Sequence, residues 1–241
     1  MRRAMTPTRE GSFRLFQFSG IEVFLHWSWL LVAYYSIQTR VGRYTSPAWA
    51  VWEYLALFGI VLLHEFGHSL ATRQVGGTSD TIVLWPFGGV AYVNAPPRAG
   101  AQLWSIAAGP LVNVVLLPIT IVLNVLAQRA ALTGGSDSLA ELVNTVMWIN
   151  IGLLVFNLLP IYPLDGGQIV RSLLWFVVGP IRSLLWATSL GFVGVILLGI
   201  YAFSSRSIWL GMLCVFIFLN CRAGWSAARA WAKAAREQGG G

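Results

Sequence analysis

Charged residues are scarce in this chain: Asp, Glu, Lys and Arg make up only 10% of its 241 residues, whereas hydrophobic residues make up 56%. A soluble domain carries about a quarter charged residues, so this composition excludes an ordinary water-soluble fold. Long apolar runs with few charges indicate that lipid is the solvent. The sequence therefore predicts an integral membrane protein.

Cysteine is scarce as well. The chain has 2 Cys residues, Cys214 and Cys221, and both lie in one apolar run. On a helix their spacing corresponds to about 10 Å along the axis, which is too far for a disulfide bond. We expect both side chains to be buried thiols.

Apolar runs of membrane-spanning character occur six times, at 21–37, 49–71, 101–127, 142–159, 183–203 and 208–223. The first run is not followed by a small-residue cleavage pattern, so it is interpreted as a retained signal-anchor. The sequence predicts an all-α polytopic membrane protein with about six transmembrane helices. Its expected parts are a cytoplasmic N-terminal segment (1–20), a membrane-embedded domain (21–223) and a cytoplasmic tail (224–241).

The formal net charge is +7, but the basic residues fall in short stretches between the apolar runs. This placement indicates membrane topology, and no nucleic-acid partner is expected. If the runs alternate in direction, Arg40, Arg43, Arg129 and Arg206 share one side, which leaves 12 of the 16 basic residues on the other. The positive-inside rule then places both termini in the cytoplasm.

Residues 81–93, between the second and third runs, read TIVLWPFGGVAYV. Short β-branched and aromatic pieces on either side of Pro and Gly residues predict a small β-hairpin. Such backbone survives at membrane depth only where it is buried in protein or lines a wet cavity. The alternative is a surface loop that dips into the lipid headgroups.

The second apolar run contains the sequence His64-Glu65-Phe66-Gly67-His68. Two histidines four residues apart share one face of a helix and can bind one zinc ion, while the intervening glutamate can act on a water molecule at the metal. Only 3 histidines occur in the whole chain. Finding two of them at this spacing inside an apolar helix favours a metal site over packing.

A catalytic zinc ion needs a third protein ligand and an open position. Glu53 precedes His64 on the same helix by about 16 Å and cannot supply it. Most other acidic residues fall in loops or at the ends of the runs, which leaves Asp165 and His26. Asp165 is favoured, because a carboxylate in the Pro- and Gly-broken apolar stretch 157–167 is costly without a cation. A lone His26 on an apolar helix is interpreted as a packing or interfacial residue.

The motif H-E-F-G-H, joined to N-L-L-P-I-Y-P-L-D-G-G at 157–167, resembles the site-2 protease family of intramembrane zinc metalloproteases. Residues 12–28 and 109–113 are also similar to family segments, so the resemblance covers most of the chain. Many family members carry an inserted PDZ domain or C-terminal CBS domains, and this chain has room for neither. The resemblance therefore implies a minimal form of the family.

The family resemblance also implies roles for individual residues. The implied zinc ligands, for one zinc ion per chain, are His64, His68 and Asp165, and Glu65 is the catalytic glutamate. The implied substrate-binding residue is Asn157. Gly88 and Gly89 in the hairpin, and Asn113, are also expected to bind substrate. The hairpin at 81–93 would receive the substrate as an added strand. Asn150 is interpreted as a structural amide that bonds a neighbouring helix.

We predict a zinc endopeptidase that cuts transmembrane segments of membrane-anchored proteins, releasing a cytoplasmic regulator. Its expected location is a bacterial inner membrane, with the site nearer the cytoplasmic side; its oligomeric state is not predicted. One alternative is a prenyl-protein-type membrane protease, in which the third ligand would be a glutamate on a later helix. Another is a transporter or metal-binding scaffold, which would not need Glu65.

Overall fold

A computed structural model describes residues 11–85 and 88–239 and divides them into two compact units. The sheet unit comprises the described part of Pro7–Ala95 together with Ala108–Val155. The helical unit comprises Pro96–Ala107 and the described part of Phe156–Gly241. Each unit is described below by itself.

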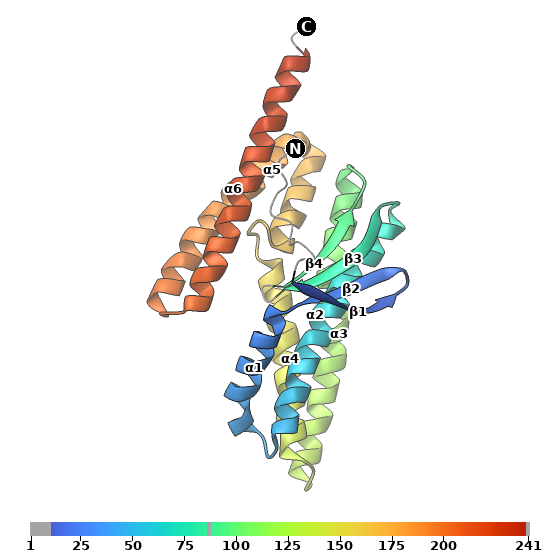
Figure 1. Cartoon of the computed structure of the whole chain (residues 1–241), viewed down its shortest axis with the longest axis vertical. Helices are drawn as coiled ribbons and strands as arrows, with labels where there is room; N and C mark the ends of the chain where they lie inside the picture. The colour runs from blue at the N-terminus through green and yellow to red at the C-terminus, as the bar shows by residue number, and fades with distance from the viewer. Residues whose placement is uncertain (1–10, 86–87, 240–241) are drawn as a thin grey trace. The chain divides into compact units, whose positions relative to one another are not determined.

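The sheet unit combines a small sheet with a helical bundle (Figure 1). Its first elements are β1 (Ser12–Phe18), β2 (Ile21–His26), α1 (Ser28–Arg40) and the short 3-10 helix η1 (Val41–Arg43). They are followed by α2 (Pro47–Gln74), β3 (Thr78–Trp85), β4 (Gly88–Asn94), most of α3 (Ala99–Leu132) and most of α4 (Asp137–Leu158). In α2, Ser46 caps the N-terminus by accepting a hydrogen bond from the amide of Ala48, and Pro47 starts the first turn.

The four strands form one sheet in the order β1-β2-β3-β4, in which β2 and β3 are parallel and the other pairs are antiparallel. Strands β3 and β4 confirm the predicted hairpin, although its turn residues, Pro86 and Phe87, lie outside the described residues. Strands β1 and β2 were not expected. Ser19 and Gly20 join them with φ values of 50° and 73°, as a two-residue hairpin turn of the mirror-image type requires.

Alternate residues of β2 explain why this apolar segment is a strand. Ile21, Val23 and Leu25 are buried and pack with Ile82 and Leu84 of β3 into the core of the unit. This period of two residues is typical of a strand with one buried face. The core continues onto the helices through further side chains, among them Trp29 of α1 and Val61 of α2.

The predicted first span, 21–37, is therefore divided between β2 and α1. With 13 residues, α1 is about 20 Å long, which is shorter than a hydrocarbon core of about 30 Å. Strand and helix together still carry the chain along most of α2. At one end of α2, Arg73 donates a hydrogen bond to the carbonyl oxygen of Gly20, and near the other end Arg40 pairs with Glu53.

The helical unit is dominated by α5 (Asp165–Ser204) and α6 (Ile208–Gly239), which pack against each other. Gly179, with φ 79° and ψ 173°, breaks α5 directly before Pro180, where helical backbone is disfavoured. Both cysteines are free and buried, as predicted, and the Cys221 thiol donates a hydrogen bond to the carbonyl oxygen of Tyr162. The expected domain boundaries, before Ile21 and after Ala223, stay predictions. Strand β1 lies before the first boundary and pairs with β2 after it, and α6 runs through the second boundary without a break.

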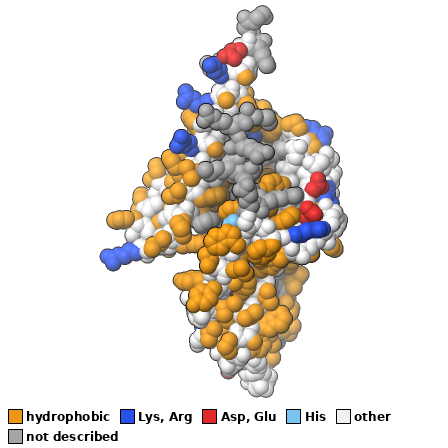
Figure 2. Space-filling view, viewed as in Figure 1, with side chains coloured by type: hydrophobic (Ala, Val, Ile, Leu, Met, Phe, Trp, Pro, Cys, Tyr) orange, Lys and Arg blue, Asp and Glu red, His pale blue; other side chains and the backbone are white. Residues whose placement is uncertain are grey.

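Five described helices, α2 to α6, are long and apolar enough to cross a membrane. Hydrophobic side chains cover the helical part of the sheet unit on the face shown in Figure 2. This surface confirms the expected polytopic membrane fold, because lipid rather than water solvates such a surface. Helix α2 differs from the rest: 44% of its most apolar window is buried inside the protein, against 17% to 33% for the others. The helix that carries the histidine motif is thus the most buried of the five.

Candidate metal centre

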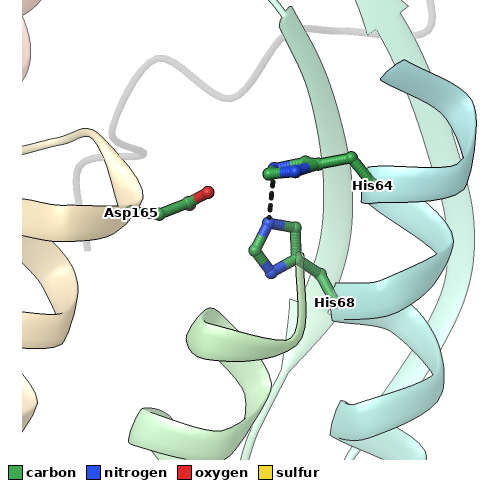
Figure 3. Close-up of side chains that lie close together, drawn as sticks. All are labelled: His64, His68 and Asp165. Carbon is green, nitrogen blue, oxygen red and sulfur yellow. Dashed lines mark hydrogen bonds between the residues drawn. The ribbon is translucent and has the colours of Figure 1, made fainter. Parts of the chain in front are cut away.

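Helix α2 places the imidazoles of His64 and His68 on one face, and both are buried, with exposures of 4% and 7%. Their Nε2 atoms lie 3.1 Å apart (Figure 3). Two nitrogens that share a tetrahedral zinc ion at about 2.0–2.1 Å are separated by about 3.3 Å. The pair therefore fits one zinc ion through the two Nε2 atoms with only a small adjustment.

Two glycines bring α3 directly against this face of α2. A Cβ atom on Gly67 would lie 2.6 Å from the carbonyl oxygen of Ala108, and one on Gly109 would lie 2.2 Å from Nε2 of His68. A side chain at position 67 would force the helices apart, and one at position 109 would displace the ring of His68. This role was not predicted from the sequence, although a glycine inside the motif and another before Pro110 were visible signals.

Behind His64, away from His68, lies a pair of asparagines. His64 Nδ1 is 2.7 Å from Oδ1 of Asn113, Nδ2 of Asn113 is 2.8 Å from Oδ1 of Asn150, and Nδ2 of Asn150 donates to the Asn113 carbonyl oxygen at 3.0 Å. Both amides are completely buried. The interpretation of Asn150 as a bridge between helices is confirmed. Asn113 contacts the motif itself.

Glu65 is 6% exposed and lies next to His64 on α2. A carboxylate at such a buried position is costly unless cations or hydrogen-bond donors surround it. Its burial on the helix that carries both histidines is compatible with the proton-transferring role that the motif predicts.

Asp165 belongs to the helical unit, where it is the first residue of α5 and partly buried (Figure 3). The helix dipole favours a carboxylate at this position. Gly166 and Gly167 let the preceding loop pack on the start of α5: a Cβ atom on either would lie 2.3 Å from a backbone atom of Leu158 or Tyr162. The Gly-Gly pair thus fixes the backbone that carries the carboxylate.

The remaining predicted site residues occupy several places. Asn157 lies in the last turn of α4 and is partly buried. Gly88 and Gly89 are the first residues of β4, opposite Trp85 and Leu84 of β3, and β4 forms one edge of the described sheet.

His26, at the end of β2, has the packing role that was favoured for it. Its ring stacks on Trp85 with centroids 4.1 Å apart, and its Nδ1 is 2.5 Å from Oγ of Ser28.

Comparison with known proteins gives a consistent result. Residues 52–200 match a family model described as peptidase family M50. Zinc metalloprotease MJ0392 of Methanocaldococcus jannaschii is 32% identical over 209 residues, which are 87% of this chain and 59% of that protein. Rip3 of Mycobacterium tuberculosis is 31% identical over 228 residues, with coverages of 85% and 56%. The chain thus spans less than two thirds of both relatives.

A solved structure, the site-2 protease from Methanocaldococcus jannaschii, matches with a TM-score of 0.61 and 30% sequence identity. The match covers 89% of this chain and 95% of that one. The similarity therefore extends over most of this chain. The family-model match by itself includes both histidines of the motif, the asparagine pair and Asp165.

Proposed function

The chain belongs to peptidase family M50, the family of the site-2 protease, and from this premise we propose that it is an intramembrane zinc endopeptidase. It is an integral membrane protein, as its five apolar helices and its family indicate. The proposed substrates are transmembrane segments of membrane-anchored proteins, whose cleavage releases a cytoplasmic regulator. The approach of the His64 and His68 Nε2 atoms to 3.1 Å carries the proposal.

The proposed metal ligands are His64, His68 and Asp165, with one zinc ion per chain. A relative named as a zinc metalloprotease supports zinc as the metal. Two imidazoles and one carboxylate form a donor set that suits catalytic zinc, because three protein ligands leave the fourth position open. Asp165 as the third ligand rests on this chemistry and on its position at the start of a helix after a broken segment.

In the proposed mechanism, a zinc ion held by His64, His68 and Asp165 would supply Lewis acidity, which would lower the pKa of a water molecule and polarise the scissile carbonyl. Glu65 accepts a proton from the attacking water on its carboxylate and donates it to the leaving amine. Asn157 is proposed to engage the substrate backbone beside the metal.

A helical substrate hides its peptide carbonyls in its own hydrogen bonds, so cleavage needs an extended segment. Strand β3 is flanked by β2 and β4, and β4 is the edge at which a substrate strand can add. Gly88 and Gly89, without side chains, allow another backbone to approach closely there. Proline substitutions along β4 are expected to slow cleavage more than prolines along β1, the opposite edge.

The proposed location is a bacterial inner membrane, with both termini in the cytoplasm. Strand β2 and helix α1 together run along α2 and would form one more membrane crossing in addition to the five long helices. This supports the proposed topology, because an even number of crossings leaves both termini on the same side. His64 lies about 26 Å along α2 from Pro47 and about 15 Å from Gln74. The proposed site is therefore nearer the sheet end of α2, which the excess of basic residues assigns to the cytoplasmic side.

The experiment that tests this function compares Glu65→Gln with wild type, both purified in detergent, on a membrane-anchored substrate. We expect Glu65→Gln to abolish cleavage while zinc stays bound, because the change removes the proton acceptor and keeps the imidazoles. Glu141→Gln, which alters a surface glutamate paired with Arg43, is the matched control and should cleave normally. Unchanged cleavage by Glu65→Gln would instead favour a role that needs no catalytic base.

A further inference from the structure

Three helices contribute to one buried polar chain behind the motif: His64 from α2, Asn113 from α3 and Asn150 from α4. Both asparagines are 0% exposed and His64 is 4% exposed, so these groups are shielded from bulk water. A buried amide that is wrongly oriented leaves a donor or an acceptor unsatisfied, and this is costly. This series of three side chains therefore has one favourable arrangement of hydrogen-bond donors and acceptors.

The backbone carbonyl oxygen of Asn113 sets that arrangement, because a carbonyl can only accept. The side-chain atom of Asn150 that lies 3.0 Å from it must be the donor Nδ2. Oδ1 of Asn150 then faces the Asn113 side chain at 2.8 Å, which must present its own Nδ2. Oδ1 of Asn113 is left to face Nδ1 of His64 at 2.7 Å.

An amide oxygen has no hydrogen to give, so His64 Nδ1 must carry the proton of this bond. In a neutral imidazole the other nitrogen, Nε2, then keeps its lone pair. That nitrogen faces Nε2 of His68 at 3.1 Å, on the side where the proposed metal would bind. The carbonyl of Asn113 thus determines, through two amides, which nitrogen of His64 is available to a metal.

We infer that Asn113 is a positioning residue that holds His64 in the Nδ1–H form and fixes its ring orientation, and that Asn150 secures Asn113. The metal-binding part of this inference rests on the proposed function, whereas the tautomer itself does not. The partners of a histidine ligand commonly tune metal affinity in this way. The inference gives Asn113 a role other than the substrate contact that the sequence suggested, since its side chain is fully buried.

The first test measures the tautomer directly, by 15N NMR of the full chain labelled at histidine, with and without zinc. The chain has 3 histidines, so His26→Gln and His68→Gln variants suffice to assign the resonances. We expect His64 to carry its proton on Nδ1 in both states. A proton on Nε2 in the zinc-free chain would overturn the inference.

The second test measures zinc affinity by chelator competition. Asn113→Leu should weaken binding about 10- to 100-fold, the range typical for loss of a partner of a metal ligand. Asn113→Asp has nearly the same size and keeps an oxygen facing Nδ1, although it loses the Nδ2 donor to Asn150. Its affinity should therefore fall less than that of Asn113→Leu. Asn150→Leu should have an intermediate effect, because Asn113 remains but is no longer secured.

The matched control is Asn124→Leu, which alters another amide of α3 that contacts Met147 of α4 and not the motif. It should leave zinc affinity unchanged. Equal losses in Asn113→Leu and Asn113→Asp would show that packing alone matters and would overturn the inference. If Asn113→Leu does not fold, the Asp variant and the NMR measurement decide. Wild type that binds no zinc would refute the proposed function, while the tautomer would still be tested.

Discussion

Gly109 on α3 packs against the imidazole of His68 on α2 so closely that an added Cβ atom would lie 2.2 Å from Nε2. The three nearest atoms to that Cβ are all ring atoms of His68, so the ring would have to move. We predict that Gly109→Ala displaces His68 and removes most bound zinc. Overpacking of this kind also costs about 1–3 kcal/mol of stability. Elemental analysis and thermal unfolding of the purified variant check both effects.

The control for this change is Gly59→Ala, which alters a glycine on α2 whose added Cβ would meet nothing within 4 Å. Zinc content should stay at the wild-type level, and stability should rise by up to about 1 kcal/mol, because alanine favours a helix over glycine. Full zinc content in Gly109→Ala would contradict this prediction, because zinc binding would then not require His68 in the position that it has in the structure.

A second prediction concerns the opposite end of α2. The Tyr44 hydroxyl donates a hydrogen bond of 2.5 Å to Glu53, whose carboxylate is buried and also pairs with Arg40 at 3.3 Å. Tyr44→Phe removes the donor and leaves the carboxylate with one partner fewer. We expect a loss of about 1.5–3 kcal/mol, the range for a hydrogen bond to a charged group. Thermal unfolding in detergent micelles measures it, and an unchanged midpoint would contradict it.

The same bond predicts a pH dependence. Burial, together with the hydrogen bond to Glu53 and its charge, raises the pKa of Tyr44 from 10.0 to about 12. A raised pKa means that the folded protein favours the neutral phenol. This stabilisation is fully present below pH 10 and is lost as the pH rises through about 12. The stability difference between wild type and Tyr44→Phe should therefore narrow between these pH values. A difference that grows with pH in this range would contradict the prediction.

A third prediction concerns Arg73, which ties the end of α2 to the sheet. Its guanidinium donates to the carbonyl oxygens of Ser19, Gly20 and Ser79 at 2.5, 3.0 and 2.9 Å. Lysine keeps the charge but cannot reach all three. Arg73→Lys should cost about 1–3 kcal/mol, since two hydrogen bonds of about 0.5–1.5 kcal/mol are lost. It should also speed proteolysis at the β1–β2 turn.

The control for Arg73 is its ion pair with Asp80, at 3.2 Å. The Asp80 side chain is 79% exposed, so water and salt screen the pair. Asp80→Asn should change stability by no more than about 1 kcal/mol. If it costs as much as Arg73→Lys, the charge pair rather than the carbonyl contacts holds the turn.

The sequence predicted the long helices well, because a membrane span needs a continuous apolar stretch. The prediction of a spanning helix over 21–37 was wrong at β2. The run beginning at Ile21 is apolar enough for lipid, but its buried side chains alternate with a period of two residues. That alternation was a usable signal. The pairing of β2 with β3 was not predictable, because it joins segments separated by all of α1 and α2.

The motif at His64 and His68 was recognisable because polar residues are rare inside apolar spans, and the i, i+4 spacing alone sets their shared face. The contact between His64 and Asn113 could not be predicted in the same way. It depends on how closely α3 approaches α2, and Gly67 and Gly109 determine that approach. An amide in a span is as readily structural as functional until its neighbours are known.

The most direct test of the proposed zinc site is the zinc content of the purified full chain, measured by elemental analysis beside His64→Ala and Asp165→Ala. The account predicts about one zinc ion per wild-type chain, as three protein ligands around a single ion require, and loss of zinc in both variants. Absence of zinc from freshly purified, folded wild type, or full zinc content in Asp165→Ala, would contradict it.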